Sequence, residues 1–225
     1  MRVAVISDVH SNLQALDAVM AELDADPPDA VLCAGDIVGY GANPNECCDI
    51  VSRRCDKIVV GNHDLSAVTG DTSLMNPYAA RASLWTSGAL SRASRSFLAS
   101  LPREEHLDLG GARVAVYHGS PRSVSEYIYE DDLEGLPLDE VKADIVIMGH
   151  THVPYVRRVG RVLAVNPGSV GQPRDSDPRA SFALLEPAAG RCLIRRLDYD
   201  TEGAAKAIIS AGLPQLLAER LYCGM

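Results

Sequence analysis

Residues 3–10 read VAVISDVH, a short apolar run that ends in two polar side chains, Asp8 and His10. A run of Val and Ile without polar alternation is typical of a strand in a sheet that is covered on both faces. In α/β proteins, functional groups collect at the carboxyl ends of such strands. The sequence therefore predicts a buried first strand that delivers Asp8 and His10 to a functional site.

The same arrangement occurs at four later apolar runs. Each run ends, within one or two residues, at side chains of the types that bind metal ions. These are Asp36 after AVLCAG, Asn62, His63 and Asp64 after KIVVG, His118 after RVAVY, and His150 and His152 after DIVIMG. Five strand ends with such side chains predict one shared site. Of the six histidines only His106 lies elsewhere, and we expect it to be solvated or at a strand edge.

The chain has 225 residues, of which 47% are hydrophobic, enough for one substantial core. We expect one domain over residues 1–225. The formal net charge of −9 excludes a broad surface for nucleic acid or for an anionic membrane, because like charges repel. A small phosphorylated substrate, bound at a local site, remains compatible with this charge.

The six cysteines are at positions 33, 47, 48, 55, 192 and 223 and form no C-x-x-C pair. This spacing indicates reduced, packed thiols rather than disulfides or a zinc site. The apolar run after Arg2 is too short for a signal peptide, and no other run approaches the length of a membrane span. We therefore expect a cytoplasmic protein without a membrane partner.

The opening of the chain alternates between strand-like and helix-like patterns and predicts a β-α-β unit. Apolar residues recur every three or four positions over 13–23, and either Ser11 or Asn12 is available as the helix cap. Residues 44–54 predict a second helix, which begins with a proline suited to a first helical turn. A further strand is expected at 57–60.

The segment that follows has a different pattern, with apolar residues at steps of three or four. They are Tyr78, Ala82, Trp85, Ala89, Ala93, Phe97 and Leu101. This period predicts helices with a break near Ser87-Gly88. The region at about 65–104 is therefore expected to be mainly helical. It is either an amphipathic packing layer or a lid over a substrate pocket.

Short strands dominate the second half of the chain. Turns rich in Gly, Pro and Asp separate them, and short turns favour antiparallel neighbours, so we expect a mixed or antiparallel sheet. Residues 201–221, interrupted by Pro214, predict two terminal helices. The strands are expected at 112–117, 144–148, 153–159, 161–165, 181–186 and 191–198.

In Asp8-Val9-His10 and in His150-Thr151-His152 the two candidate ligands are two residues apart. An extended backbone would direct both side chains of such a pair to one side, so each pair is expected to bind one metal ion. Asp36 has two carboxylate oxygens and follows the small Gly35, which makes it a candidate for a ligand shared by two ions. The mixture of imidazole and carboxylate indicates transition metals rather than Mg²⁺ or Ca²⁺ alone.

The motifs D-x-H, G-D, G-N-H-D, H and G-H-x-H, in this order over residues 8–152, resemble those of the calcineurin-like metallophosphoesterase superfamily. Two further segments, GDIVGYG at 35–41 and NPGSVGQPR at 166–174, are similar to its compact bacterial and archaeal phosphodiesterase branch. The resemblance implies an α/β fold of two mixed β-sheets packed as a sandwich and flanked by helices, a four-layer αββα arrangement. It also implies a single domain over 1–225 with a mainly helical insertion at about 65–104.

The resemblance further implies a role for each residue at the strand ends. The implied ligands are Asp8, His10 and His152 for one metal ion, Asn62, His118 and His150 for the other, and Asp36 as the bridge. His63 would be a catalytic residue beside the leaving group, and Asp64 would orient or tune its imidazole. The implied cofactors are two divalent transition-metal ions, Mn²⁺ or an Fe/Mn pair, with Zn²⁺ or Ni²⁺ as alternatives.

These side chains predict a metal-dependent phosphodiesterase that hydrolyses a small phosphodiester or nucleotide. Two divalent ions, two aspartates and a bridging hydroxide would leave about one positive charge, which attracts a phosphodiester and holds the hydroxide for in-line attack. A phosphomonoesterase, such as a protein phosphatase or a dinucleoside polyphosphate hydrolase, is the alternative within the same chemistry. A non-catalytic scaffold or regulatory binding protein would be expected to have lost ligands, whereas all of them are present.

Four further residues are candidates for substrate contacts, namely Asn12, Tyr40, Arg122 and Arg174. Arginine binds phosphate through two N–H groups when it points inward, and tyrosine stacks on nucleobases. Each residue also has a structural alternative. Asn12 is expected to cap a helix, the two arginines to form surface ion pairs, and Tyr40 to pack in the interior.

Overall fold

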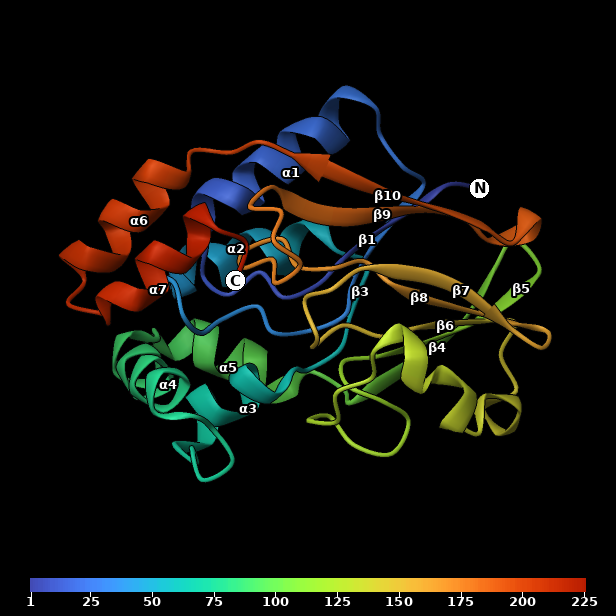
Figure 1. The fold of residues 1–225 in the computed structure, drawn as a ribbon, viewed down its shortest axis with the longest axis horizontal. Helices are drawn as coiled ribbons and strands as arrows, with labels where there is room; N and C mark the ends of the chain where they lie inside the picture. Colours follow the sequence, from blue (N-terminus) through green and yellow to red (C-terminus); the bar gives the residue numbers. More distant parts are fainter.

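The computed structural model describes residues 1–225, and its strands form two five-stranded sheets that share one core (Figure 1). In spatial order the first sheet contains β10 (Arg191–Leu197), β9 (Ala180–Glu186), β1 (Val3–Ile6), β2 (Ala30–Cys33) and β3 (Lys57–Ile58). The second sheet contains β4 (Glu104–Leu109), β5 (Ala112–Tyr117), β6 (Ile145–Ile147), β8 (Val162–Asn166) and β7 (Tyr155–Val159).

Helices surround the two sheets. The α-helices are α1 (Leu13–Ala25), α2 (Pro44–Arg54), α3 (Asn62–Thr69), α4 (Pro77–Ala89), α5 (Arg92–Ser100), α6 (Thr201–Ser210) and α7 (Gln215–Glu219). The 3₁₀ turns are η1 (Glu130–Gly135), η2 (Leu138–Val141), η3 (Pro187–Ala189) and η4 (Arg220–Tyr222). None of the helices combines the length and the apolar character that a transmembrane helix requires.

Both sheets are mixed. β1, β2 and β3 run parallel, whereas β9 is antiparallel to both β1 and β10. In the second sheet β5, β6 and β8 run parallel, and the edge strands β4 and β7 are antiparallel to their neighbours. The predicted α/β sandwich of two mixed sheets with flanking helices is confirmed.

The last two strands of the chain belong to the first sheet, which corrects the expectation that they extend a sheet of the second half. β9 pairs with β1, so that Val3 is opposite Leu185 and Val5 is opposite Ala183. β1 pairs with β2 on one side only, and β9 satisfies the backbone groups on its other side. Short turns in the sequence predict pairing between strands that are consecutive in the chain. No turn marks the pairing of β1 with β9, because these strands are far apart in the sequence.

Burial on both faces explains the continuous apolar run at the start of the chain. Val3 and Val5 point into the core between the two sheets. Ala4 and Ile6 point to the opposite side, where they pack with residues of α1 and α2. Alternate residues of a strand face opposite sides, so a strand that is covered on both faces needs no polar position.

Fewer regular helices cover the outer face of the second sheet than cover the outer face of the first sheet. Ile128, Leu133 and Leu138, from the segment that contains η1 and η2, pack on Ala115 and Val146 of the sheet. This segment is the yellow-green one in Figure 1. The fourth layer of the sandwich is therefore made of 3₁₀ turns and loops.

Three helices, α3 to α5, occupy most of the region that is predicted to be helical. The break lies at Leu90–Ser91, two residues after the predicted Ser87-Gly88, because the side chain of Ser91 accepts the Ser94 N–H and caps α5. The last residues of the region leave the helix, since α5 ends at Ser100 and β4 follows. His106 therefore lies on an edge strand, as expected.

The C-terminal helices α6 and α7 lie on the same side of the molecule as α4 (Figure 1). Pro214 separates α6 from α7, as predicted. Leu217 and Ala204 of these helices share a cluster with Ala82 of α4 and with Tyr40 of the loop after β2. The C-terminal helices thus support a loop that carries a candidate substrate residue.

Phe182 of β9 is fully buried among residues of α1 and α2, so it tests the position of this strand. We expect Phe182→Ala to lower the free energy of unfolding by about 3–5 kcal/mol, because it leaves a cavity in the core. Leu193→Ala, on the neighbouring strand at a position that is 57% exposed, should change it by less than about 0.5 kcal/mol. Chemical denaturation measures both values, and equal effects would contradict the placement of β9.

Candidate metal centre

The carboxyl ends of β1, β2, β3, β5 and β6 converge, and the candidate ligands that follow them lie together in the interior. Three groups have ligand atoms within 4.8 Å of one another. They are Asp8, His10 and His152; His10, Asp36 and His63; and Asp36, His118 and His150. The groups share members, so they form one continuous site.

The loops at this site have unusual backbone geometry. Nine non-glycine residues of the chain have a positive φ. Seven of them are Asp8, His10, Ser11, Asp36, Tyr40, His150 and His152. Left-handed backbone at such residues costs free energy and is concentrated at functional sites. These turns redirect the chain just after β1, β2 and β6, so the candidate ligands at these three strand ends enter the interior.

The extended backbone expected for the D-x-H and H-x-H motifs is therefore absent. Asp8 and His10 still belong to one group, although each has a φ near +50°. The two residues of the H-x-H pair separate, because His152 lies with Asp8 and His10, whereas His150 lies with His118. The expectation that the H-x-H pair faces a single ion is wrong.

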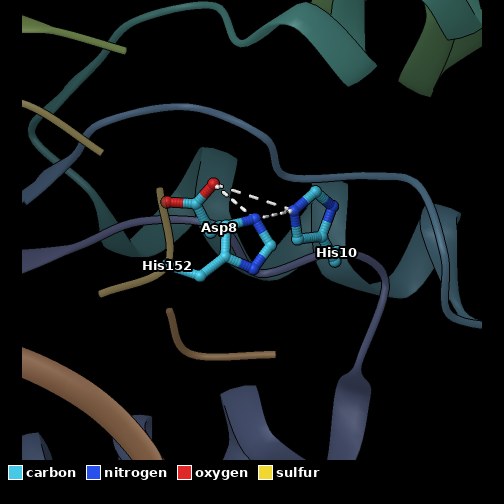
Figure 2. Close-up of side chains that lie close together, drawn as sticks. All are labelled: Asp8, His10 and His152. Atoms are coloured by element: carbon cyan, nitrogen blue, oxygen red, sulfur yellow. Dashed lines mark hydrogen bonds and ion pairs between the residues drawn. The ribbon is translucent and has the colours of Figure 1, made fainter. Parts of the chain in front are cut away.

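The first group consists of Asp8, His10 and His152, whose side chains point toward one another in Figure 2. His10 Nε2 lies 3.0 Å from His152 Nε2. Asp8 Oδ1 lies 3.3 Å from His152 Nε2 and 3.7 Å from His10 Nε2. This carboxylate oxygen is buried and accepts no hydrogen bond. Three ligand atoms thus face one small space.

Backbone carbonyls determine the orientation of both imidazoles. His10 Nδ1 donates to Val38 O at 3.1 Å, and His152 Nδ1 donates to Gln172 O. A carbonyl oxygen only accepts, so Nδ1 carries the proton and the two Nε2 lone pairs face each other. Lone pairs at 3.0 Å repel each other unless a positive charge lies close to both. The chemistry of this group therefore fits a cation.

Asn62 lies beside the group of Asp36, His118 and His150, and these four residues together form the second group of ligands. His118 Nε2 lies 3.2 Å from Asp36 Oδ2 and 3.1 Å from Asn62 Oδ1. Its Nδ1 donates to Ala34 O at 2.7 Å, which leaves Nε2 as the inward-facing atom. His150 Nε2 is buried without a hydrogen-bond partner. Two nitrogens and two oxygens are therefore available to a second cation.

Asp36 lies between the two groups. Its Oδ2 is 3.6 Å from His10 Nε2 and 3.2 Å from His118 Nε2, and this oxygen accepts no hydrogen bond. Its Oδ1 accepts the backbone N–H of His63 at 2.8 Å. One oxygen thus anchors the carboxylate, and the other faces both groups of ligands.

Two glycines allow the close packing around Asp36 and His63. A Cβ atom on Gly61 would lie 2.0 Å from Asp36 Oδ1. A Cβ atom on Gly39, where φ is +102°, would lie 2.5 Å from His63 Nδ1. Any larger residue at either position would displace a side chain of the site.

Burial and the Asp36 carboxylate control the charges of the histidines. Burial lowers the pKa of His118, but Asp36 outweighs burial and raises this pKa to about 9. Burial lowers the pKa of His150 to about 4, and it holds the pKa of His152 well below its usual range. Two imidazoles are thus neutral and able to bind metal at neutral pH, while Asp36 attracts a positive charge.

His63 lies against the first group. Its ring centroid is 4.8 Å from that of His10 and 4.5 Å from that of Tyr40. Its Nδ1 is buried and has no hydrogen-bond partner, and burial lowers its pKa to about 3. His63 is therefore a neutral imidazole at the edge of the candidate ligands.

Asp64 forms no hydrogen bond with the ring of His63, contrary to the expectation that it orients this imidazole. Its Oδ1 accepts the Val38 N–H at 3.0 Å, and its Oδ2 accepts the Gly61 N–H at 2.9 Å. Burial and the neighbouring Asp36 raise its pKa to about 6. Asp64 ties the loop after β2 to the start of α3, so it positions the loops of the site.

Two of the four candidates for substrate contacts lie beside the first group. The ring of Tyr40 packs on His10 with their centroids 4.7 Å apart. Arg174 donates to the Tyr40 hydroxyl at 3.2 Å and to Gln172 Oε1 at 3.0 Å, and its guanidinium lies over the Tyr40 ring. Arg174 has no carboxylate partner, so its charge is available to an anion.

The other two candidates have structural partners. Asn12 caps α1 by accepting the Ala15 N–H at 3.1 Å, and its amide donates to Gly171 O at 2.9 Å. Arg122 donates two hydrogen bonds to Glu126, at 2.6 and 3.0 Å, in an exposed ion pair. Asn12 thus caps a helix and Arg122 forms a surface ion pair, which are the structural roles expected for them as alternatives to substrate binding.

Sequence reasoning missed Tyr127 and three backbone carbonyls. The ring centroid of Tyr127 lies 3.9 Å from that of His150. Tyr127 follows no strand end and lies in a segment without strand or helix, so no sequence signal marks it. The carbonyls that orient the histidines belong to Ala34, Val38 and Gln172. Every residue has a carbonyl, so the sequence does not distinguish these three.

Comparison with known proteins places this site in a family. The Calcineurin-like phosphoesterase superfamily domain matches residues 1–190. The crystal structure of a metallophosphoesterase from Sphaerobacter thermophilus is 38% identical, with a TM-score of 0.87, and the match covers 100% of this chain and 99% of that one. An uncharacterised protein of Methanocaldococcus jannaschii is 37% identical over 243 residues, covering 99% of this chain and 98% of the relative.

The chain therefore belongs to the calcineurin-like phosphoesterase superfamily, and the resemblance of its motifs to that superfamily is confirmed. Membership of this class supports a phosphoester hydrolase, and the His and Asp groups of the site could hold metal ions. A shorter similarity, 40% identity over 43 residues, relates the chain to the phosphodiesterase YfcE of Escherichia coli K12. It covers 19% of this chain and 23% of that protein.

The raised pKa of His118 predicts that metal binding depends on pH. Below about pH 9 this imidazole holds a proton that an incoming cation must displace, so Mn²⁺ should bind more weakly as the pH falls. For one displaced proton we expect affinity to decrease about tenfold per pH unit, or about 100-fold between pH 8 and pH 6. Titration calorimetry of metal-free protein measures this, and equal affinity at the two pH values would contradict it.

Proposed function

We propose that the chain is a metal-dependent phosphodiesterase that hydrolyses a small phosphodiester or nucleotide. The observation that carries this proposal is Asp36 Oδ2, a buried carboxylate oxygen without a hydrogen-bond donor that faces both His10 and His118. A buried carboxylate in such a place is stable only when positive charge compensates it. Family membership supports the same chemistry.

The side chains present fit two divalent ions. The proposed ligands are Asp8, His10 and His152 for one ion, Asn62, His118 and His150 for the other, and Asp36 for both. Mixed nitrogen and oxygen donors suit Mn²⁺ or an Fe/Mn pair, with Zn²⁺ or Ni²⁺ as alternatives. When bound, the ions would supply a hydroxide nucleophile at neutral pH and neutralise charge on the phosphate.

His63 is proposed to donate an N–H to the departing oxygen of the substrate. Burial keeps its imidazole neutral, and a neutral imidazole carries one N–H donor. Negative charge that develops on the departing oxygen strengthens this hydrogen bond, and the hydrogen bond in turn stabilises the departing oxygen. Asp64 supports the step from a distance, because it fixes the start of the helix that carries His63.

Arg174 is proposed to bind a phosphate oxygen. It lies over Tyr40, next to the first group of ligands, and no carboxylate neutralises it. A guanidinium binds phosphate through two N–H groups. This local charge, together with the bound ions, would attract an anionic substrate to a protein whose formal net charge is −9.

A diesterase is favoured over a scaffold protein because the full set of ligands is present, and all of them except the half-buried Asn62 are buried. The similarity to YfcE, a protein named as a phosphodiesterase, supports a diester over a monoester. We also propose a single domain over residues 1–225 in which the helical region at about 65–104 borders the substrate. A cytoplasmic location is part of the proposal, which the six unpaired cysteines support.

Hydrolysis of bis(p-nitrophenyl) phosphate tests the proposed activity. Protein stripped of metal with a chelator should be inactive, and Mn²⁺ should restore turnover as about two ions bind per chain. Asp36→Asn should reduce both metal content and turnover, because it removes the carboxylate charge that faces both groups. Absorbance assays and elemental analysis measure these quantities. Absence of turnover with each of Mn²⁺, Fe²⁺, Zn²⁺, Co²⁺ and Ni²⁺ would exclude the activity.

The role of His63 is tested by His63→Ala, which should keep both ions and lose about 10²- to 10⁴-fold in kcat on an alkyl phosphodiester. The loss should be smaller on bis(p-nitrophenyl) phosphate, since p-nitrophenolate departs without a proton. The matched control is His106→Ala, on edge strand β4 outside the site, and it should leave kcat unchanged. Wild-type kcat in the His63 variant would remove this residue from the mechanism.

A further inference from the structure

A cavity of about 410 Å³ opens beside the second group of candidate ligands. Asn62 and His150 lie in its wall, so it is continuous with the site. One side is formed by α3 and the loop that leads to α4, and the other by the loop that carries Tyr127. A cavity of this volume is in the range of small-molecule binding sites.

The cavity is lined by thirteen residues, of which five are apolar and the others, including Asp71 and Arg103, are polar or charged. The apolar residues present surface that no other part of the chain covers. Leu65, Leu74 and Met75 line one side, and Val124 and Tyr127 line the other. Leu74 is 90% exposed and Tyr127 is 49% exposed, although both are large apolar or aromatic side chains. Burying such surface is favourable, and aromatic rings pack well on tyrosine and on methionine sulfur.

Hydrogen bonds hold the cavity in shape. The Ser66 hydroxyl of α3 donates to Asp71 O at 2.6 Å and lies 3.5 Å from Met75 Sδ, so the loop after α3 is tied to its helix. Ser83 of α4 donates to the same hydroxyl at 2.8 Å. On the other wall, the ring of Tyr127 rests on that of His150. The cavity therefore needs no large rearrangement to accept a ligand.

His63 and the cavity lie next to different groups of ligands. His63 and Tyr40 pack on His10 of the first group. The cavity borders Asn62 and His150 of the second group. A substrate whose leaving group lies at His63 would therefore fill the cavity only if its phosphorus carried a second organic group, as in a diester.

We propose that this cavity binds an aromatic group that the phosphodiester retains after the leaving group departs. The inference rests on the proposed function and deepens it by naming the substrate class, a diester with one aromatic substituent. Tyr127 and Leu74 then determine specificity, because they present the largest apolar surfaces to that substituent.

The experiment compares three diesters that share p-nitrophenol as leaving group and differ in the retained group: methyl, phenyl and 5′-thymidyl. With the Mn²⁺-loaded enzyme we expect kcat/KM to be at least about tenfold higher for the phenyl ester than for the methyl ester. A higher value for the thymidyl ester than for the phenyl ester would identify the aromatic group as a nucleobase, and the reverse order would identify it as a simple aryl group.

Two variants test the walls. Tyr127→Ala and Leu74→Ser should each bring the phenyl-to-methyl ratio of kcat/KM toward one, because each removes surface that the ring covers. Leu74 is 90% exposed and Tyr127 is about half exposed, so the variants should fold, which circular dichroism checks. The matched control is Tyr222→Ala, at an exposed tyrosine outside the cavity wall, and it should keep the wild-type ratio.

The possible failures are distinguishable. If the wild-type enzyme hydrolyses the methyl and phenyl esters equally well, the aromatic site is excluded and the phosphodiesterase activity stands. A ratio that is unchanged in both wall variants would also exclude it. If none of the three esters is hydrolysed, the proposed function itself fails.

Discussion

The structure depends on two buried carboxylates, Asp8 and Asp36, each of which has one inward-facing oxygen without a hydrogen-bond donor. Burying a charge in this way is unfavourable unless an opposite charge lies close by. Backbone carbonyls hold the Nδ1–H groups of His10, His118 and His152, so the Nε2 atoms of all three imidazoles face the site. The two buried carboxylates therefore require a positive charge close to them.

The surrounding fold holds the carboxylates and imidazoles in place although the loops that carry them have a strained backbone. Left-handed backbone at Asp8, Asp36 and the neighbouring loop residues is unfavourable, and it persists because packed sheets fix both ends of each loop. Asp64 ties two of these loops together through backbone N–H groups. Gly39 and Gly61 leave the space in which His63 and Asp36 pack. Backbone strain, glycine residues and close packing occur together at the site because each is required to hold Asp8, Asp36 and the histidines close to one another.

Charged and apolar groups lie in two different regions of the site. Arg174 and Tyr40 lie at the first group of ligands, and the apolar cavity with Tyr127 lies at the second. A phosphate between them would meet cationic and hydrogen-bonding groups, while an organic substituent would meet an apolar wall. The net charge of the whole chain carries little information about binding at this site, because Arg174 and the proposed metal ions would make the local charge positive.

The sequence by itself determined the strands, most of the helices, the family and the candidate ligands, because buried strands have a simple apolar pattern and polar residues at their ends stand out. It did not determine that β9 and β10 join the first sheet. The spacing of the H-x-H motif also placed His150 and His152 at one ion, although the family resemblance assigned them to different ions. Only the tertiary structure decided that Asp64 binds backbone N–H groups, that Arg122 is used in an ion pair, and that Tyr127 covers His150. Local patterns report which face of an element is apolar, whereas the partner of a polar side chain depends on which distant segments the fold brings together.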